Sequence, residues 1–115
     1  MADFQDITGI KIAQAAITTD YVVIYTSPTD TRTYVKDIMI ANTTGSGGAA
    51  ITVSVNIVPE ATTTDTSNAI IADYSIAKQE YFQWSGLQIL NPGDTIEVKG
   101  SATGCTVTIS GGQAV

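Results

Sequence analysis

Apolar and polar residues alternate along much of this chain. In the segment AITVSVNIV (50–58), every second residue is a β-branched apolar one. A side-chain period of two places one face of a segment against a core and the other toward water, which predicts a half-buried β-strand. The intervening polar residues, which we expect to face solvent, are Thr52, Ser54 and Asn56.

Strands of this kind recur along the chain, separated by turn and loop signals. The expected strands are residues 10–19, 21–26, 33–42, 50–58, 69–75, 79–84, 95–99 and 106–110. Pro28 and Asp30 mark one turn, and Pro92 and Gly93 mark another. Residues 75–81 have room for one helical turn at most, and residues 111–115 (GGQAV) are expected to form a loose tail.

This pattern predicts an all-β fold, namely an antiparallel two-sheet β-sandwich or jelly roll of about eight strands. An all-parallel sheet would need helical crossovers that the sequence does not offer. Residues 1–8 are expected to form an N-terminal arm with Phe4 as its one large apolar side chain, and residues 9–115 a single β-sandwich domain.

Two of the expected strands are apolar on both faces. Residues 21–25 (YVVIY) form one of them. In residues 33–42, simple alternation gives two apolar faces, one with Val35, Met39 and Ala41 and the other with Tyr34, Ile38 and Ile40. Because a sandwich strand needs only one apolar face, the second must be covered by loops or the arm of the same chain, or by another subunit.

The charge of the chain bears on its partners. The 115 residues carry a net charge of −6, with no histidine and only five Lys and Arg, which are scattered. Binding to nucleic-acid phosphates or to an anionic membrane needs clustered Lys and Arg, so we expect neither partner. The N-terminus lacks the basic and apolar stretches of a signal peptide, so we expect synthesis in a cytoplasm.

The sequence offers little for catalysis. Without histidine no Ser–His or Cys–His pair can form, and zinc ligation by Cys and His is excluded. The acidic residues lie in expected turns and on exposed strand faces, without the spacing of a calcium loop. Cys105, the only cysteine, precedes the last expected strand and is predicted to be a small buried side chain. We therefore predict a non-enzymatic protein with no catalytic residue, metal or cofactor.

One group of aromatic residues has three open interpretations. Phe82 and Trp84 share one face of the expected strand 79–84, with Glu80 beside them, while Tyr81 points the other way. The pair could belong to the core, or it could contact another subunit, since Trp and Tyr are enriched at interfaces. It could also form a platform on which a sugar ring stacks.

Two stretches resemble small virion proteins of tailed bacteriophages. In the first stretch, the resemblance lies in strand starts, a turn and a Gly/Ser loop: VVIYTSPTDTRTYVKDIMIANTTGSGGAAITVSVNIV (22–58). The second stretch is similar to the closing strands of the same proteins: LQILNPGDTIEVKGSATGCTVTISG (87–111). The motifs are structural, so they identify an architecture rather than a set of site residues.

The resemblance implies a structural role in the virion. It favours a capsid decoration (cement) protein on the capsid surface, which binds and stabilises the shell as a homotrimer, with the major capsid protein or other virion proteins as partners. A neck, tail or fibre component is the alternative, and a carbohydrate-binding module for host adsorption is the third hypothesis. The residues expected at subunit interfaces are Phe4, Tyr34, Ile38, Ile40, Phe82 and Trp84.

Overall fold

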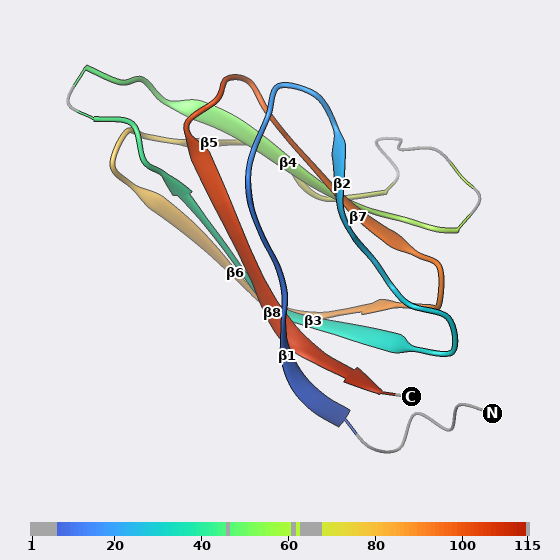
Figure 1. Ribbon diagram of the computed structural model, residues 1–115. Helices are drawn as coiled ribbons and strands as arrows, with labels where there is room; N and C mark the ends of the chain where they lie inside the picture. Colours follow the sequence, from blue (N-terminus) through green and yellow to red (C-terminus); the bar gives the residue numbers. More distant parts are fainter. Residues whose placement is uncertain (1–6, 46, 61, 63–67, 115) are drawn as a thin grey trace.

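The computed structural model describes residues 7–45, 47–60, 62 and 68–114 of the chain (Figure 1). Within these residues the chain forms eight β-strands and no α-helix, which confirms the expected all-β fold. The strands are β1 (Ile7–Ala16), β2 (Val22–Thr26), β3 (Arg32–Asn42), β4 (Ile51–Val58), β5 (Ala69–Ile76), β6 (Tyr81–Leu90), β7 (Thr95–Gly100) and β8 (Cys105–Ala114).

The strands form two antiparallel sheets whose order is that of a jelly roll. Sheet A has the order β1-β8-β3-β6, and sheet B has the order β2-β7-β4-β5. Every connection except β4–β5 passes from one sheet to the other, and the first and last strands lie side by side (Figure 1). This nested arrangement is the eight-stranded jelly roll.

The core lies between the two sheets and consists mainly of Ile and Val side chains. Ile38 and Ile40 from β3 and Ile109 from β8 meet Val53 and Val55 from β4, and all of them are buried. Each fully buried side chain of this size contributes about 1.5–3 kcal/mol relative to an exposed one. β-branched residues suit strands, so the same positions form the strands and fill the core.

Strand β3 shifts its inward-facing positions by one residue near Lys36. Its pairing with both neighbours, β6 and β8, changes register between Val35 and Asp37. A β-bulge inserts one extra residue into a strand. Two residues that lie three positions apart, one on each side of the bulge, can therefore both face the core. Val35 and Ile38, which are three residues apart, are accordingly both fully buried.

The expected grouping of Tyr34 with Ile38 and Ile40 on one face is therefore wrong. Ile38 and Ile40 are fully buried in the core, whereas Tyr34 lies on the outer face of sheet A. The second expected face is divided in the same way, because Val35 is buried while Met39 is only half-buried. Simple alternation failed because it assumes a strand without a bulge.

The expectation for the polar residues of β4 is also wrong in part. Ser54 and Asn56 are buried, with 6% and 1% of their surfaces exposed, and Thr52 is half-buried. β4 is an inner strand of sheet B, so β5 and β7 flank it on both sides. The longer side chains of Lys99 and Glu97 on β7 lie in register with Ser54 and Asn56, and Asp73 of β5 accepts from the Ser54 hydroxyl.

Local signals predicted the turns better than the strand ends. The expected turns are confirmed at Pro28, whose carbonyl accepts from the Thr31 amide, and at Asn91, whose carbonyl accepts from the Asp94 amide. β6 is one continuous strand, and the turn before it replaces the possible helical turn. The expected tail instead continues β8 as far as Ala114, where it pairs with both β1 and β3.

Strand β1 begins at Ile7, within the range expected for the arm. Phe4, the anchor expected in the arm, lies outside the described residues. Residues 7 and 8 instead pair with the end of β8 and belong to the sandwich.

Asn42, the last residue of β3, ties the two sheets together at one end of the sandwich. Its side-chain amide donates to the carbonyl oxygens of Ala49 and Ile76, at 3.0 and 2.9 Å. Its side-chain oxygen accepts from the amide and the hydroxyl of Thr44. The side chain is 2% exposed, and all of its hydrogen-bonding capacity is used.

We predict that Gly111→Ala destabilises the fold by about 2–3 kcal/mol, because a Cβ there would overlap the backbone carbonyl of Tyr34 beside the bulge. The matched control is Gly9→Ala on the adjacent strand, where a Cβ meets only the Gly111 carbonyl oxygen at 3.8 Å. Urea unfolding measures both variants. Equal stability of the two variants would contradict the close backbone approach at the bulge.

We predict that Asn42→Ala lowers the free energy of unfolding by about 3 kcal/mol, since buried carbonyl groups lose their donors. Thr43→Ala is the control, because it removes one hydrogen bond, to the Gly104 carbonyl, from an exposed side chain. We expect the control to lose under about 1 kcal/mol in the same thermal or urea unfolding measurement. A similar small loss in Asn42→Ala would show that Asn42 does not hold the two sheets together.

Candidate interaction surface

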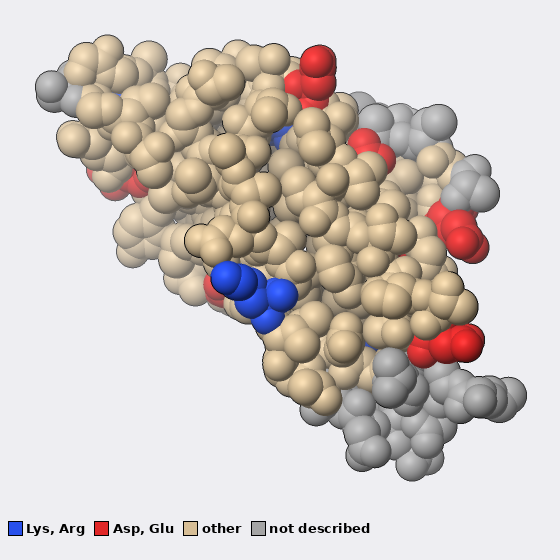
Figure 2. All heavy atoms as spheres, viewed as in Figure 1, with Lys and Arg blue, Asp and Glu red and all other residues tan. Residues whose placement is uncertain are grey.

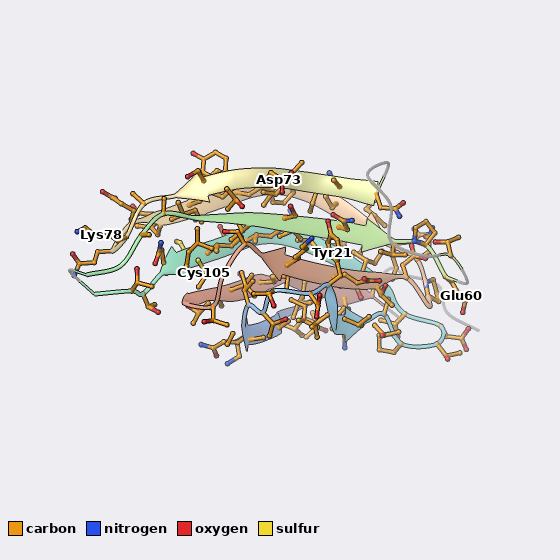
Figure 3. The ribbon with its side chains drawn as sticks, turned by 90° about the horizontal axis from the view of Figure 1, so that it is seen from above. Tyr21, Glu60, Asp73, Lys78 and Cys105 are labelled. Atoms are coloured by element: carbon orange, nitrogen blue, oxygen red, sulfur yellow. The ribbon has the colours of Figure 1, made fainter. Side chains whose placement is uncertain are left out.

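The titratable side chains labelled in Figure 3 lie apart from one another. Figure 3 shows Lys78 and Glu60 at opposite ends of the molecule, Asp73 on β5 along one side, and Cys105 in the interior. Among the residues that the structure describes, no group of three or more Cys, Asp or Glu side chains is placed to hold a metal ion. A hollow of about 480 Å³ at the β2–β3 and β6–β7 turns has Asp30 and Glu60 as its acidic lining residues.

Three carboxylates have structural hydrogen bonds. Asp94 accepts from the backbone amides of Asn91 and Glu60, which fixes the turn before β7. Asp73 accepts from the Ser54 hydroxyl, and Asp37 accepts from the Gln83 side-chain amide. These contacts hold turns and neighbouring strands together, which agrees with the expectation that the acids form turns and surface contacts.

Phe82 and Trp84 point inward from β6. Their cross-strand partners are Ile40 and Ile38, which are fully buried, and residues paired in this way share a face of the sheet. Both rings are half-buried against the core, because β6 is the edge of sheet A. The Phe82 ring also packs against Tyr74 of β5, with 4.2 Å between ring centroids. This placement favours the core interpretation of the pair over a sugar-stacking platform.

The six residues expected at subunit interfaces do not form one surface. Ile38 and Ile40 have no exposed area left for another subunit, and Phe82 and Trp84 turn toward the core. Phe4 is outside the described residues. Tyr34 alone lies on the outer face of sheet A, where it borders a groove.

This groove, which we name the Tyr34 groove, is an apolar hollow of about 260 Å³ on the outer face of sheet A. It is lined by Gly9, Tyr34, Lys36, Leu87, Gly111 and Gly112. Gly9, Gly112, Tyr34 and Ile89 lie side by side across the four strands. Gly9 and Gly112 lie next to each other and have no side chains, so backbone forms the floor and Tyr34 forms one wall. Sequence reasoning missed this site, because the glycines are far apart in sequence and only the sheet order brings them together.

Exposed apolar side chains continue from the groove along β6. Leu87 is 51% exposed and Ile89 is 46% exposed, and Tyr81 at the other end of the strand is 66% exposed. The side of the molecule where β1 and β2 lie in front has few charged side chains, and its acidic groups lie apart near the margin (Figure 2). This side of the molecule is therefore weakly charged, and exposed apolar residues of sheet A extend from the groove along β6.

Cys105 is 1% exposed and lies in the core at the start of β8, as the sequence predicted. Burial disfavours the charged thiolate and raises the pKa of this thiol. A neutral, enclosed thiol is a poor nucleophile.

Comparisons with known proteins identify the fold only. No family model and no curated protein matches this chain. Among solved structures, a chain in the structure of the infectious bursal disease virus Gx strain is similar, with a TM-score of 0.52 and 12% sequence identity. The match covers 98% of this chain but only 32% of that chain, so this protein spans about a third of its length. In the described part of the chain, no helix has the length and apolar character needed to cross a bilayer.

We predict that a thiol reagent at pH 8 labels native Cys105 only as fast as the protein unfolds. Above the unfolded thiol pKa of about 8.5, the unfolded state ionises Cys105 while burial keeps the folded thiol neutral. The free energy of unfolding is therefore unaffected by this thiol below that pH and falls as pH rises above it. Urea unfolding should therefore show that the free energy of unfolding falls more between pH 7 and pH 10 in the wild type than in Cys105→Ala. Rapid labelling of the native protein would contradict the burial of the thiol.

Proposed function

We propose that this protein is a non-enzymatic structural component of a virion, and specifically a decoration protein that binds and stabilises an assembled capsid shell. The observation that carries the proposal is the strand order β1-β8-β3-β6 against β2-β7-β4-β5. That jelly roll recurs in viral capsid domains. The solved structure with a similar fold comes from a virus, and two stretches of the sequence resemble virion proteins of tailed phages.

Lectins share the jelly roll, so fold alone does not decide the function. A sugar-binding platform needs exposed aromatic faces, but Phe82 and Trp84 are half-buried and directed toward the core. The carboxylates of Asp37, Asp73 and Asp94 likewise accept structural hydrogen bonds. The weakly charged surface and the apolar groove instead suit contact with another protein.

The Tyr34 groove is the surface that we assign to the shell. Its apolar lining and the exposed Leu87 at its border can bury area against a side chain of a shell protein. A partner could approach the backbone at its floor closely, since Gly9 and Gly112 have no side chains. Residues 1–6, with Phe4, would add a second contact if the expected arm forms a strand on a neighbouring protein.

Stabilisation would follow from linkage. A protein that binds only the assembled shell shifts the equilibrium toward that state by RT ln(1 + [L]/Kd), which is about 2.7 kcal/mol per site at a concentration of 100 Kd. Many sites on one shell would add such terms, so a small subunit without catalytic chemistry can oppose internal pressure.

We predict that purified protein binds to the shells of particles made without it, and raises the temperature at which they release DNA. Electron microscopy with immunogold labelling locates the protein, and a DNA-binding dye reports release. Label at the portal or tail alone would indicate the neck or tail alternative. Absence of binding to any part of the particle would contradict a virion role.

A pair of variants tests the groove as the contact. Gly9→Leu places a side chain in the groove, where a Cβ has room, and is expected to weaken shell binding roughly tenfold or more. Thr106→Leu is the control, because it adds a similar side chain to an exposed position on β8, away from the groove. Equal binding of the two variants would show that the shell contacts another surface.

A further inference from the structure

One of the six residues that line the Tyr34 groove is charged, namely Lys36, and its side chain is exposed. Asp37, the next residue of β3, does not line the groove. Its carboxylate instead accepts from the side-chain amide of Gln83, at 2.6 Å. The lining of the groove therefore presents one cation and no anion to whatever enters it.

The ammonium group of Lys36 has no partner in the part of the chain that the structure describes, where no hydrogen bond, ion pair or ring contact involves it. The chain carries eleven Asp and Glu against five Lys and Arg, so an unpaired cation stands out. The other four basic side chains each have a partner, and they are Lys11, Arg32, Lys78 and Lys99. The Lys36 ammonium is therefore available to an acceptor from another molecule.

The position of Lys36 follows from irregular strand pairing. The register of β3 against β6 shifts at Lys36 and Leu87, and neither residue has a cross-strand partner there. The pairing of β3 with β8 also skips Lys36. Bulges re-aim side chains, and they are frequent beside functional sites. Here both unpaired residues line the groove, so a cation and an exposed apolar side chain border the same hollow.

We propose that the Tyr34 groove binds a segment of the shell protein in which a large apolar side chain lies beside an Asp or Glu. The apolar side chain would fill the hollow of about 260 Å³ against Tyr34 and Leu87, and the carboxylate would pair with the Lys36 ammonium. A basic residue beside the apolar one would be repelled, so one charge selects among apolar segments. This inference rests on the proposed function, because it names the chemistry of the partner that the groove accepts.

Two small molecules of similar shape test the preference for a carboxylate. Phenylpropionate carries an aromatic ring and a carboxylate, and phenylpropionamide is its neutral counterpart. Titrations followed through the NMR amide signals of Gly9 and Gly112 should show roughly two- to fivefold tighter binding of the carboxylate. Equal binding of the two molecules, or no shift of either glycine signal, would overturn the proposal.

A pair of variants with the same net charge assigns that preference to Lys36. Lys36→Met keeps the apolar stem and removes the ammonium group, so the preference for the carboxylate should disappear. Lys99→Met is the matched control, since Lys99 lies on β7 of the other sheet, and the preference should persist. Urea unfolding confirms that both variants are folded. A preference that survives in Lys36→Met would contradict the role of its ammonium group.

Shell binding separates this inference from the proposed function. Lys36→Met should weaken binding to shells made without the protein roughly two- to fivefold, and Lys99→Met should leave it unchanged. If Gly9→Leu weakens binding and Lys36→Met does not, the groove still contacts the shell, but the acidic partner is overturned. If neither variant weakens binding, the assignment of the groove to the shell fails as well.

Residues 1–6 (MADFQD) have the same chemistry as the proposed partner, since Phe4 lies between Asp3 and Asp6. If this segment of the chain itself filled the groove, phenylpropionate would bind several-fold more tightly to Phe4→Ser than to the wild type. We expect equal affinity. Tighter binding to Phe4→Ser would overturn the assignment of the groove to a shell protein.

Discussion

Every strand of this jelly roll must keep its apolar residues between the two sheets while it pairs with its neighbours, and β3 meets this constraint only through its bulge. β3 is an inner strand, bonded to β6 and β8 over its length. If the alternation ran unbroken through Lys36, either Val35 or the pair Ile38 and Ile40 would point outward. The bulge keeps all three inside and leaves Tyr34 on the outer face, where it lines the groove with Gly111 and Gly112. The core and the groove therefore have one cause.

The fold class could be predicted from local pattern because each strand was marked by period-two alternation and by turn residues such as Pro28 and Pro92. The position of a strand within its sheet could not, because it depends on pairing between distant segments. Ser54 and Asn56 read as solvent-facing by alternation, but they lie on an inner strand between longer side chains. Gly111 and Gly112 were expected to belong to a loose tail, but their pairing with β1 and β3 makes them part of β8.

The candidate site was predictable only in its general character. Excess apolar residues on the strand around Tyr34 indicated a surface that something covers, and in the structure Tyr34 of β3 borders a groove. The same excess at Ile38 and Ile40 had a different cause, namely the shifted core face after the bulge. No sequence signal connects Gly9 with Gly112, since 102 intervening residues separate two strands that the jelly roll makes neighbours. Asn42 was likewise one polar residue at a strand end until the fold placed Ala49 and Ile76 around it.

The Tyr34 groove depends on the order of sheet A rather than on any one segment. Its shape comes from missing side chains and from the walls of Tyr34 and Leu87. Its lining residues come from β1, β8, β3 and β6, which are all four strands of the sheet. A partner in the groove would therefore contact residues that are distant in sequence and that only the jelly-roll strand order brings together.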